Sequence, residues 1–169
     1  AISITSLDRR LARSMEPRAS TPQKRLEAIR QLTEAGIPAS VMVAPIVPGL
    51  TDAEIERILD SARAAGALDA GYVLLRLPLE VSPIFKDWLL RHYPDRFRHV
   101  MSLIRSMRGG KDYDSDWSTR MRGTGPYAWQ IGRRFELAAK RLGFNRARTP
   151  LRTDLFVAAD KPEKQLMLL

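Results

Sequence analysis

An alternation of strand and helix signals across the first 80 residues most constrains how this chain can fold. Apolar runs at 1–5, 39–45 and 72–77 have the length of strands, and helical periodicity occupies 23–35 and 51–65 between them. This order favours parallel strands joined by right-handed crossovers. The run at 39–45 is almost continuously apolar, which predicts a strand buried on both faces. The sequence therefore predicts an α/β arrangement for this half.

Both helices of this half carry start signals. Thr21 can cap the first helix, and Pro22 suits the first helical position, where no free N–H is needed. Thr51 and Glu54 have the spacing of a capping box, in which each side chain binds the other residue's backbone N–H. Further upstream, the segment 8–10, Asp-Arg-Arg, is interpreted as an exposed charged turn.

The second half of the chain predicts helices rather than strands. Helical periodicity occupies three segments, 84–93, 96–107 and 127–142, the first two separated by Pro94 and the last stopped by Gly143. A polar, glycine-led loop is expected at 109–116, and the chain from 149 onward has neither a helical nor a strand period. We therefore expect three units: an α/β unit at 1–80, a helical basic extension at 81–148 and an extended tail at 149–169.

The composition limits the chemistry of the chain. Its 169 residues are 44% apolar and 28% charged, which suits one folded domain. The absence of cysteine excludes disulfides, thiolate metal sites and a cysteine nucleophile, and with only two histidines we expect no metal ligand set in this chain. No stretch reaches the ~20 apolar residues of a membrane span. Since no signal peptide pattern is present either, we expect a cytoplasmic protein.

The first residues form a strand signal without an initiator Met. Domains usually begin with a few loose residues, so this start suggests the C-terminal part of a longer protein. A closely trimmed boundary is the alternative.

Positive charge is concentrated in one segment. The net charge is +9, and residues 105–152 hold 12 basic and four acidic side chains. Aromatic residues are interspersed among these charges: Tyr113, Trp117, Tyr127 and Trp129. Basic groups that follow phosphates and rings that stack on bases are typical of nucleic-acid binding. The alternative is a solvated basic surface whose aromatic residues belong to the core.

Four segments carry a resemblance to a known family. They are Ser3-Ile4-Thr5, Leu7-Asp8, Glu16-Pro17-Arg18-Ala19-Ser20, and 44–52, which reads Ala-Pro-Ile-Val-Pro-Gly-Leu-Thr-Asp. In order and spacing they resemble the second half of a radical S-adenosylmethionine (radical SAM) enzyme of the spore photolyase-like branch, grouped with DNA repair photolyases. The resemblance extends from Ile2 to Pro78. It implies the last three parallel strands of a partial (β/α)6 barrel, followed by a helical, basic C-terminal extension.

The resemblance also implies an activity for the parent protein. In that family a three-cysteine loop holds a 4Fe-4S cluster, and this loop is expected upstream of Ala1. The N-terminal half of the same protein is therefore an expected partner, and this chain alone is expected to be inactive. The parent is expected to cleave SAM reductively to a 5′-deoxyadenosyl radical and to abstract hydrogen, acting on nucleic acid as a lyase of DNA repair. The alternative is a non-catalytic basic module that binds nucleic acid and is tethered to the DNA sliding clamp.

Cofactor-binding residues are expected at the carboxyl ends of the parallel strands, where such folds place their functional groups. They are Ser3, Thr5, Glu16, Ala44, Pro45, Ile46 and Arg76. Ser3 matches the family's serine that contacts the cofactor, with the ribose hydroxyls as its target, and 44–46 would border the adenine. Arg76 can reach a carboxylate or phosphate, and Glu16 a hydroxyl.

Each of these assignments has a structural alternative. Ser3 and Thr5 can satisfy backbone groups at a strand end. Glu16 can pair with Arg13 or Arg18, and Arg76 with Glu80 or another carboxylate. The catalytic residues themselves are not predicted.

The end of the chain carries a separate motif. Gln165, Leu166, Leu168 and Leu169 have the pattern by which bacterial repair and replication proteins bind the DNA sliding clamp. The glutamine would hydrogen-bond at one pocket while the closing leucines fill an apolar one. We therefore expect the clamp as a possible partner. A tail that packs on the protein's own barrel is the alternative.

Overall fold

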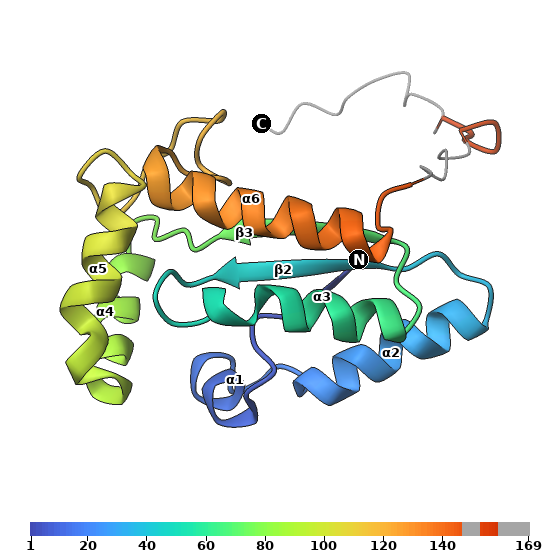
Figure 1. Ribbon diagram of the computed structural model, residues 1–169, viewed down its shortest axis with the longest axis horizontal. Helices are drawn as coiled ribbons and strands as arrows, with labels where there is room; N and C mark the ends of the chain where they lie inside the picture. The colour runs from blue at the N-terminus through green and yellow to red at the C-terminus, as the bar shows by residue number, and fades with distance from the viewer. Residues whose placement is uncertain (147–152, 159–169) are drawn as a thin grey trace, which may run out of the picture.

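A computed structural model describes residues 1–146 and 153–158 of the chain. Three parallel strands form one sheet in the order β1-β2-β3 (Figure 1), where β1 is Ile2–Ser3, β2 is Ser40–Ile46 and β3 is Asp69–Leu74. Helix α2 (Pro22–Glu34) connects β1 to β2, and α3 (Ile55–Ala64) connects β2 to β3. The expected parallel α/β arrangement is confirmed. The sheet is open and is not closed into a barrel.

The other helices pack on this sheet or lie beyond its strand ends. They are α1 (Arg9–Met15), α4 (Val81–His92), α5 (Phe97–Ser106) and α6 (Gly125–Leu142), with short 3-10 turns at Asp52–Glu54 and Pro94–Arg96. Figure 1 shows α4 and α5 beyond the end toward which β2 points, and α6 running alongside α3. None of the helices within the described ranges has both the length and the apolar character needed to cross a membrane.

The main core lies between the sheet and the helices α2, α3 and α6. Val41 and Val43 of β2 and Tyr72 of β3 are buried there, together with side chains from all three helices. Met42 and Ala44, which alternate with these valines, are only half-buried. The prediction of a strand buried on both faces is therefore wrong: β2 alternates, because the helices pack on the face that holds its valines.

A second core joins α1, α4 and α5 beyond the strand ends. Leu11 of α1 is buried in it with Leu89 of α4. The Trp88 indole N–H donates to the Ser14 carbonyl at 3.0 Å and so fastens α1 to α4. The Asp8 carboxylate caps α1 by accepting from the N–H groups of Arg10 and Leu11. The predicted charged turn at 8–10 is therefore wrong, since these residues begin a helix.

The expected capping box is also wrong. The Thr51 hydroxyl accepts the Val47 N–H at 2.8 Å instead of an N–H of its own helix. The Glu54 carboxylate accepts from the Ser6 hydroxyl at 3.0 Å and the Leu7 N–H at 2.6 Å. Both side chains thus hold loops at the strand ends, and α3 begins only at Ile55. The cap at Thr21 is confirmed, because its hydroxyl accepts the Lys24 N–H.

The remaining boundaries differ little from those expected. Strand β3 begins at Asp69, three residues earlier than predicted, because the less apolar segment 69–71 already pairs with β2. Gly143 ends α6 in the left-handed conformation at φ 74°, which glycine adopts without strain. The motif at 165–169 and most of the tail lie outside the described residues, and the expected clamp contact stays a prediction.

Candidate active site

A pocket of about 390 Å³ lies at the carboxyl ends of the strands. Five of the seven predicted residues line it: Ser3, Glu16, Ala44, Pro45 and Arg76. The other walls are apolar and come from the end of β3 and from Met121. Parallel strands bring these residues together although they are spread over 74 positions of the chain, from Ser3 to Arg76.

Two predicted residues do not line this pocket. Thr5 is buried behind it, and its hydroxyl contacts the Glu16 carboxylate and the Ala44 carbonyl, each at 3.0 Å. It therefore positions two pocket residues. Ile46 is only 1% exposed and belongs to the core on the helix side of the sheet.

Glu16 is the centre of a polar network at one end of the pocket. Its Oε2 atom accepts from the Thr5 hydroxyl and pairs with the Arg25 guanidinium at 3.1 Å. Arg25 also donates to the carbonyl of Ser3 at 2.9 Å and to its hydroxyl at 3.3 Å. The salt-bridge partner of Glu16 is thus Arg25 of α2, rather than Arg13 or Arg18. The other carboxylate oxygen, Oε1, has no hydrogen-bond partner among the described residues.

Arg76 lies at the other end of the pocket without an acidic partner in the described ranges. Its guanidinium donates to the Tyr113 hydroxyl at 3.1 Å and approaches the Met121 sulfur at 3.9 Å. Its Nε atom is buried and has no hydrogen-bond partner. The expected alternative of pairing with Glu80 is not found. A cation held this way keeps its charge available for an anionic group.

The loop between α5 and α6 forms the wall that carries Met121. The Leu74 N–H donates to the Met121 carbonyl at 2.9 Å, so the loop lies along the end of β3. Arg108 is only 3% exposed, and its guanidinium donates to the Leu75 carbonyl at 3.1 Å and the Thr119 carbonyl at 3.0 Å. Burial lowers the pKa of Arg108. This side chain therefore links the loop to the strand that carries Arg76.

A second contact holds the start of the same loop. The Asp112 carboxylate forms ion pairs with Lys86 of α4 and, at 2.8 Å, with Arg105 of α5. Lys86 first, and then Arg105, lowers the pKa of Asp112 despite an opposing effect of burial. Both ends of the loop are thus fixed to helices or to the strand end.

Sequence reasoning did not identify Arg25, Arg108 or Met121 as parts of the site. Arg25 was recognised only as part of a helix, and no local spacing rule links it to Glu16. Arg108 was counted within the basic segment, where its type indicates a solvated charge. Its burial follows from loop packing that no periodic pattern encodes.

Comparison with known proteins finds one family match, in the N-terminal part of the chain. Residues 1–62 match the Radical SAM superfamily. The match extends from β1 to α3 and includes the predicted residues Ser3, Thr5, Glu16 and 44–46, whereas Arg76 lies beyond it. No solved structure shows a significant match to the chain.

The curated relatives are uncharacterized proteins. Rv2578c of Mycobacterium tuberculosis is 35% identical over 107 residues, which cover 62% of this chain and 32% of that protein. MJ0683 of Methanocaldococcus jannaschii is 28% identical over 99 residues, or 59% of this chain and 36% of that protein. ORF301 of Acidianus two-tailed virus is 45% identical over 47 residues, which cover 28% of this chain and 16% of that protein. The chain thus matches about a third or less of the length of these relatives.

The pocket residues fit the cofactor that the Radical SAM superfamily uses. The apolar wall of Pro45 and Val73 suits a nucleoside base, while Ser3 and the unpartnered Oε1 of Glu16 offer groups for sugar hydroxyls. Arg76, with its unpartnered Nε, suits a carboxylate.

Proposed function

We propose that this pocket holds the nucleoside and amino-acid parts of SAM in a radical SAM enzyme. The observation that carries the proposal is the convergence of Ser3, Glu16 and Arg76 on one pocket at the strand ends. Ser3 and Glu16 would bind the ribose, and Arg76 the carboxylate. Bound to a reduced 4Fe-4S cluster, SAM supplies a radical that abstracts hydrogen from a substrate. Because this chain has no cysteine, cysteine ligands of the cluster would come from outside this sequence, from the N-terminal half of the same protein.

Glu16→Gln tests the proposed site. The variant keeps an oxygen acceptor for Arg25 but removes the charge of the group proposed to accept from the ribose. In the complete protein, purified anaerobically with its cluster, we expect the KM for SAM to rise about tenfold because a charge-assisted hydrogen bond is lost. The measurement is release of 5′-deoxyadenosine at varied SAM concentration.

Glu34→Gln is the matched control, because Glu34 is exposed at the end of α2 and forms no ion pair within the described residues. Its KM is expected to equal that of the wild type. An unchanged KM for Glu16→Gln in a correctly folded variant would contradict the ribose assignment.

We also propose that the enzyme acts on nucleic acid, as in the DNA repair photolyase-like branch. The loop before α6 supports this substrate class by presenting an aromatic ring to solvent. Trp117 is 81% exposed, and the Arg120 guanidinium lies 3.4 Å from the centre of its ring. Trp129 of α6 is 72% exposed. An exposed ring beside a guanidinium suits base stacking next to phosphate contacts. The same surface would serve a non-catalytic nucleic-acid-binding module.

Trp117→Ala tests the nucleic-acid surface. Loss of one stacking platform is expected to weaken single-strand binding by about tenfold. Fluorescence anisotropy with a labelled oligonucleotide measures the affinity. Leu137→Ala, which removes an exposed apolar side chain from α6, should leave it unchanged. Equal affinities for wild type and Trp117→Ala would contradict stacking at this ring.

A further inference from the structure

A second pocket, lined by arginines, adjoins the candidate site. It has a volume of about 420 Å³ and lies between α1 and the start of α2. Arg9, Arg10 and Arg13 of α1 line it together with Ser20, and so does Glu16. Glu16 therefore belongs to both pockets, and a molecule that occupies one lies next to the other. We call this cavity the α1 arginine pocket.

The arginines of this pocket have no carboxylate partner in the part of the chain that the structure describes. Of the acidic groups nearest in sequence, Asp8 caps α1, and Glu16 binds Arg25 and Thr5 through Oε2 while its Oε1 has no partner among the described residues. Other helices differ in this respect. In α2, α4 and α6 an arginine pairs with a carboxylate three or four residues away. Three arginines against the single carboxylate of Glu16 give the cavity lining a positive charge, which favours an anion as its occupant.

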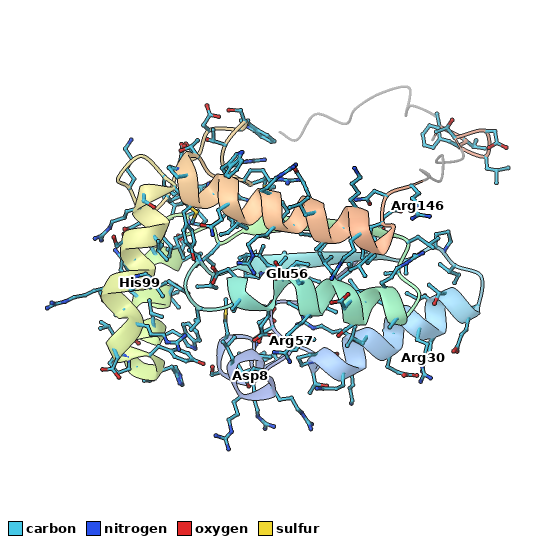
Figure 2. All side chains as sticks on the ribbon, in the orientation of Figure 1. Asp8, Arg30, Glu56, Arg57, His99 and Arg146 are labelled. Carbon is cyan, nitrogen blue, oxygen red and sulfur yellow. The ribbon has the colours of Figure 1, made fainter. Side chains whose placement is uncertain are left out.

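The chemistry of the lining points to phosphate. Guanidinium groups bind phosphate oxygens through paired N–H donors, and the exposed Ser20 side chain adds a hydroxyl. A lipid surface is a poorer occupant, because α1 turns its Leu11 into the core and so offers no apolar face for a bilayer. Figure 1 shows α1 on the opposite side of α3 from α6, and Figure 2 shows Asp8 at that outer side. The arginines are therefore distinct from the basic segment at 105–152.

We propose that the α1 arginine pocket binds a backbone phosphate of the nucleic-acid substrate and so guides the strand to the candidate site. This inference rests on the proposed action on nucleic acid. It assigns phosphate contacts to α1, which is outside the segment that composition alone marks as basic.

The test compares two triple variants of the complete protein that remove the same charge. One carries Arg9→Gln, Arg10→Gln and Arg13→Gln. The control carries Arg57→Gln, Arg96→Gln and Arg98→Gln, at exposed side chains outside both basic surfaces that also lack ion pairs within the described residues. The probe is a labelled single-stranded oligonucleotide of about 12 nucleotides, titrated at several salt concentrations.

We expect the α1 variant to bind the oligonucleotide about tenfold more weakly at ~0.1 M salt, with the slope of log affinity against log salt reduced by about 0.7, as the loss of one neutralised phosphate requires. The control should change affinity less than about twofold. Equal losses of affinity in both variants would show that the effect comes from net charge alone, and this would overturn the proposal.

Two further arms distinguish other ligands. Binding of inorganic phosphate alone, or of phosphatidylglycerol vesicles, without binding of the oligonucleotide would also overturn the proposal. The SAM measurement on Glu16→Gln stands apart from these titrations. An unchanged oligonucleotide affinity in the α1 variant therefore excludes only the phosphate contact. An unchanged KM for SAM in Glu16→Gln excludes only the ribose assignment.

Discussion

Replacement of Arg108 by alanine is expected to lower the free energy of unfolding by about 3 to 5 kcal/mol. The guanidinium is nearly fully buried and donates to the carbonyls of Leu75 and Thr119. Its removal leaves both acceptors without these donors and opens a cavity between β3 and the loop before α6. Urea unfolding followed by circular dichroism measures the effect.

The loss of Arg108 should also loosen the loop between α5 and α6. Without this link the segment 109–123 keeps the contacts of Asp112, the Tyr113 hydroxyl and the Met121 carbonyl but loses its contact with the buried guanidinium, so trypsin is expected to cut it faster than in the wild type. Arg91→Ala is the control, because Arg91 is 72% exposed in a surface ion pair with Asp87 and its loss should cost less than about 0.5 kcal/mol. If Arg108→Ala were as stable as Arg91→Ala, the assigned link between loop and strand would be wrong.

The sheet was predictable because its signals are local and repeated. Apolar runs of strand length alternate with helical stripes, and this order nearly determines parallel pairing. Helix α1 was not predictable in the same way, since its seven residues place a single buried side chain, Leu11, among three arginines. A periodic pattern cannot be recognised in so short a segment. Its stability comes instead from the Asp8 cap and from packing against α4.

Side chains with two possible partners mark a second limit of sequence reasoning. Thr51 and Glu54 have the spacing of a capping box, yet both bind segments that follow strands: Thr51 binds Val47 after β2, and Glu54 binds Leu7 after β1. A local rule ranks only local partners, whereas the N–H of Leu7 reaches Glu54 because parallel pairing brings two strand ends together. Parallel pairing thus supplies the distant partner that takes the Glu54 side chain, and for this reason the spacing rule misplaces the start of α3.

The candidate site was predictable to the extent that it depends on strand ends. Ser3, Ala44 and Arg76 were placed together because parallel strands present their carboxyl ends at one edge. Ile46 lies at the same strand end, but its side chain joins Val41 and Val43 in the core, because a register irregularity between Val43 and Ile46 interrupts the alternation of faces. The contributions of Arg25 and Met121 depend on helix and loop packing.

Helix α6 provides the second large expected effect. The Tyr127 hydroxyl donates to the Asp52 carboxylate at 2.6 Å, and this carboxylate belongs to a residue that is only 8% exposed. Tyr127→Phe is expected to lower the free energy of unfolding by about 2 kcal/mol at neutral pH, because a shielded carboxylate loses its donor. Urea unfolding measures the loss. Tyr93→Phe is the control, because Tyr93 is half-buried and its hydroxyl has no hydrogen bond within the described residues. This variant should lower the free energy of unfolding by much less.

The same contact predicts how stability changes in alkali. Burial first, and then the hydrogen bond to Asp52, raises the pKa of Tyr127 from 10.0 to about 12. The folded state thus keeps a proton that the unfolded chain releases, so this contribution is complete below pH 10 and is lost as the pH rises toward 12. The difference in stability between wild type and Tyr127→Phe should therefore shrink across that interval. A difference that stayed constant would mean that the hydroxyl does not hold Asp52. The polar attachment of α6 to α3 would then depend on two ion pairs: Arg134 with Glu56 at 2.7 Å, where Figure 2 shows Glu56 between the two helices, and Arg141 with Asp60 at 3.3 Å.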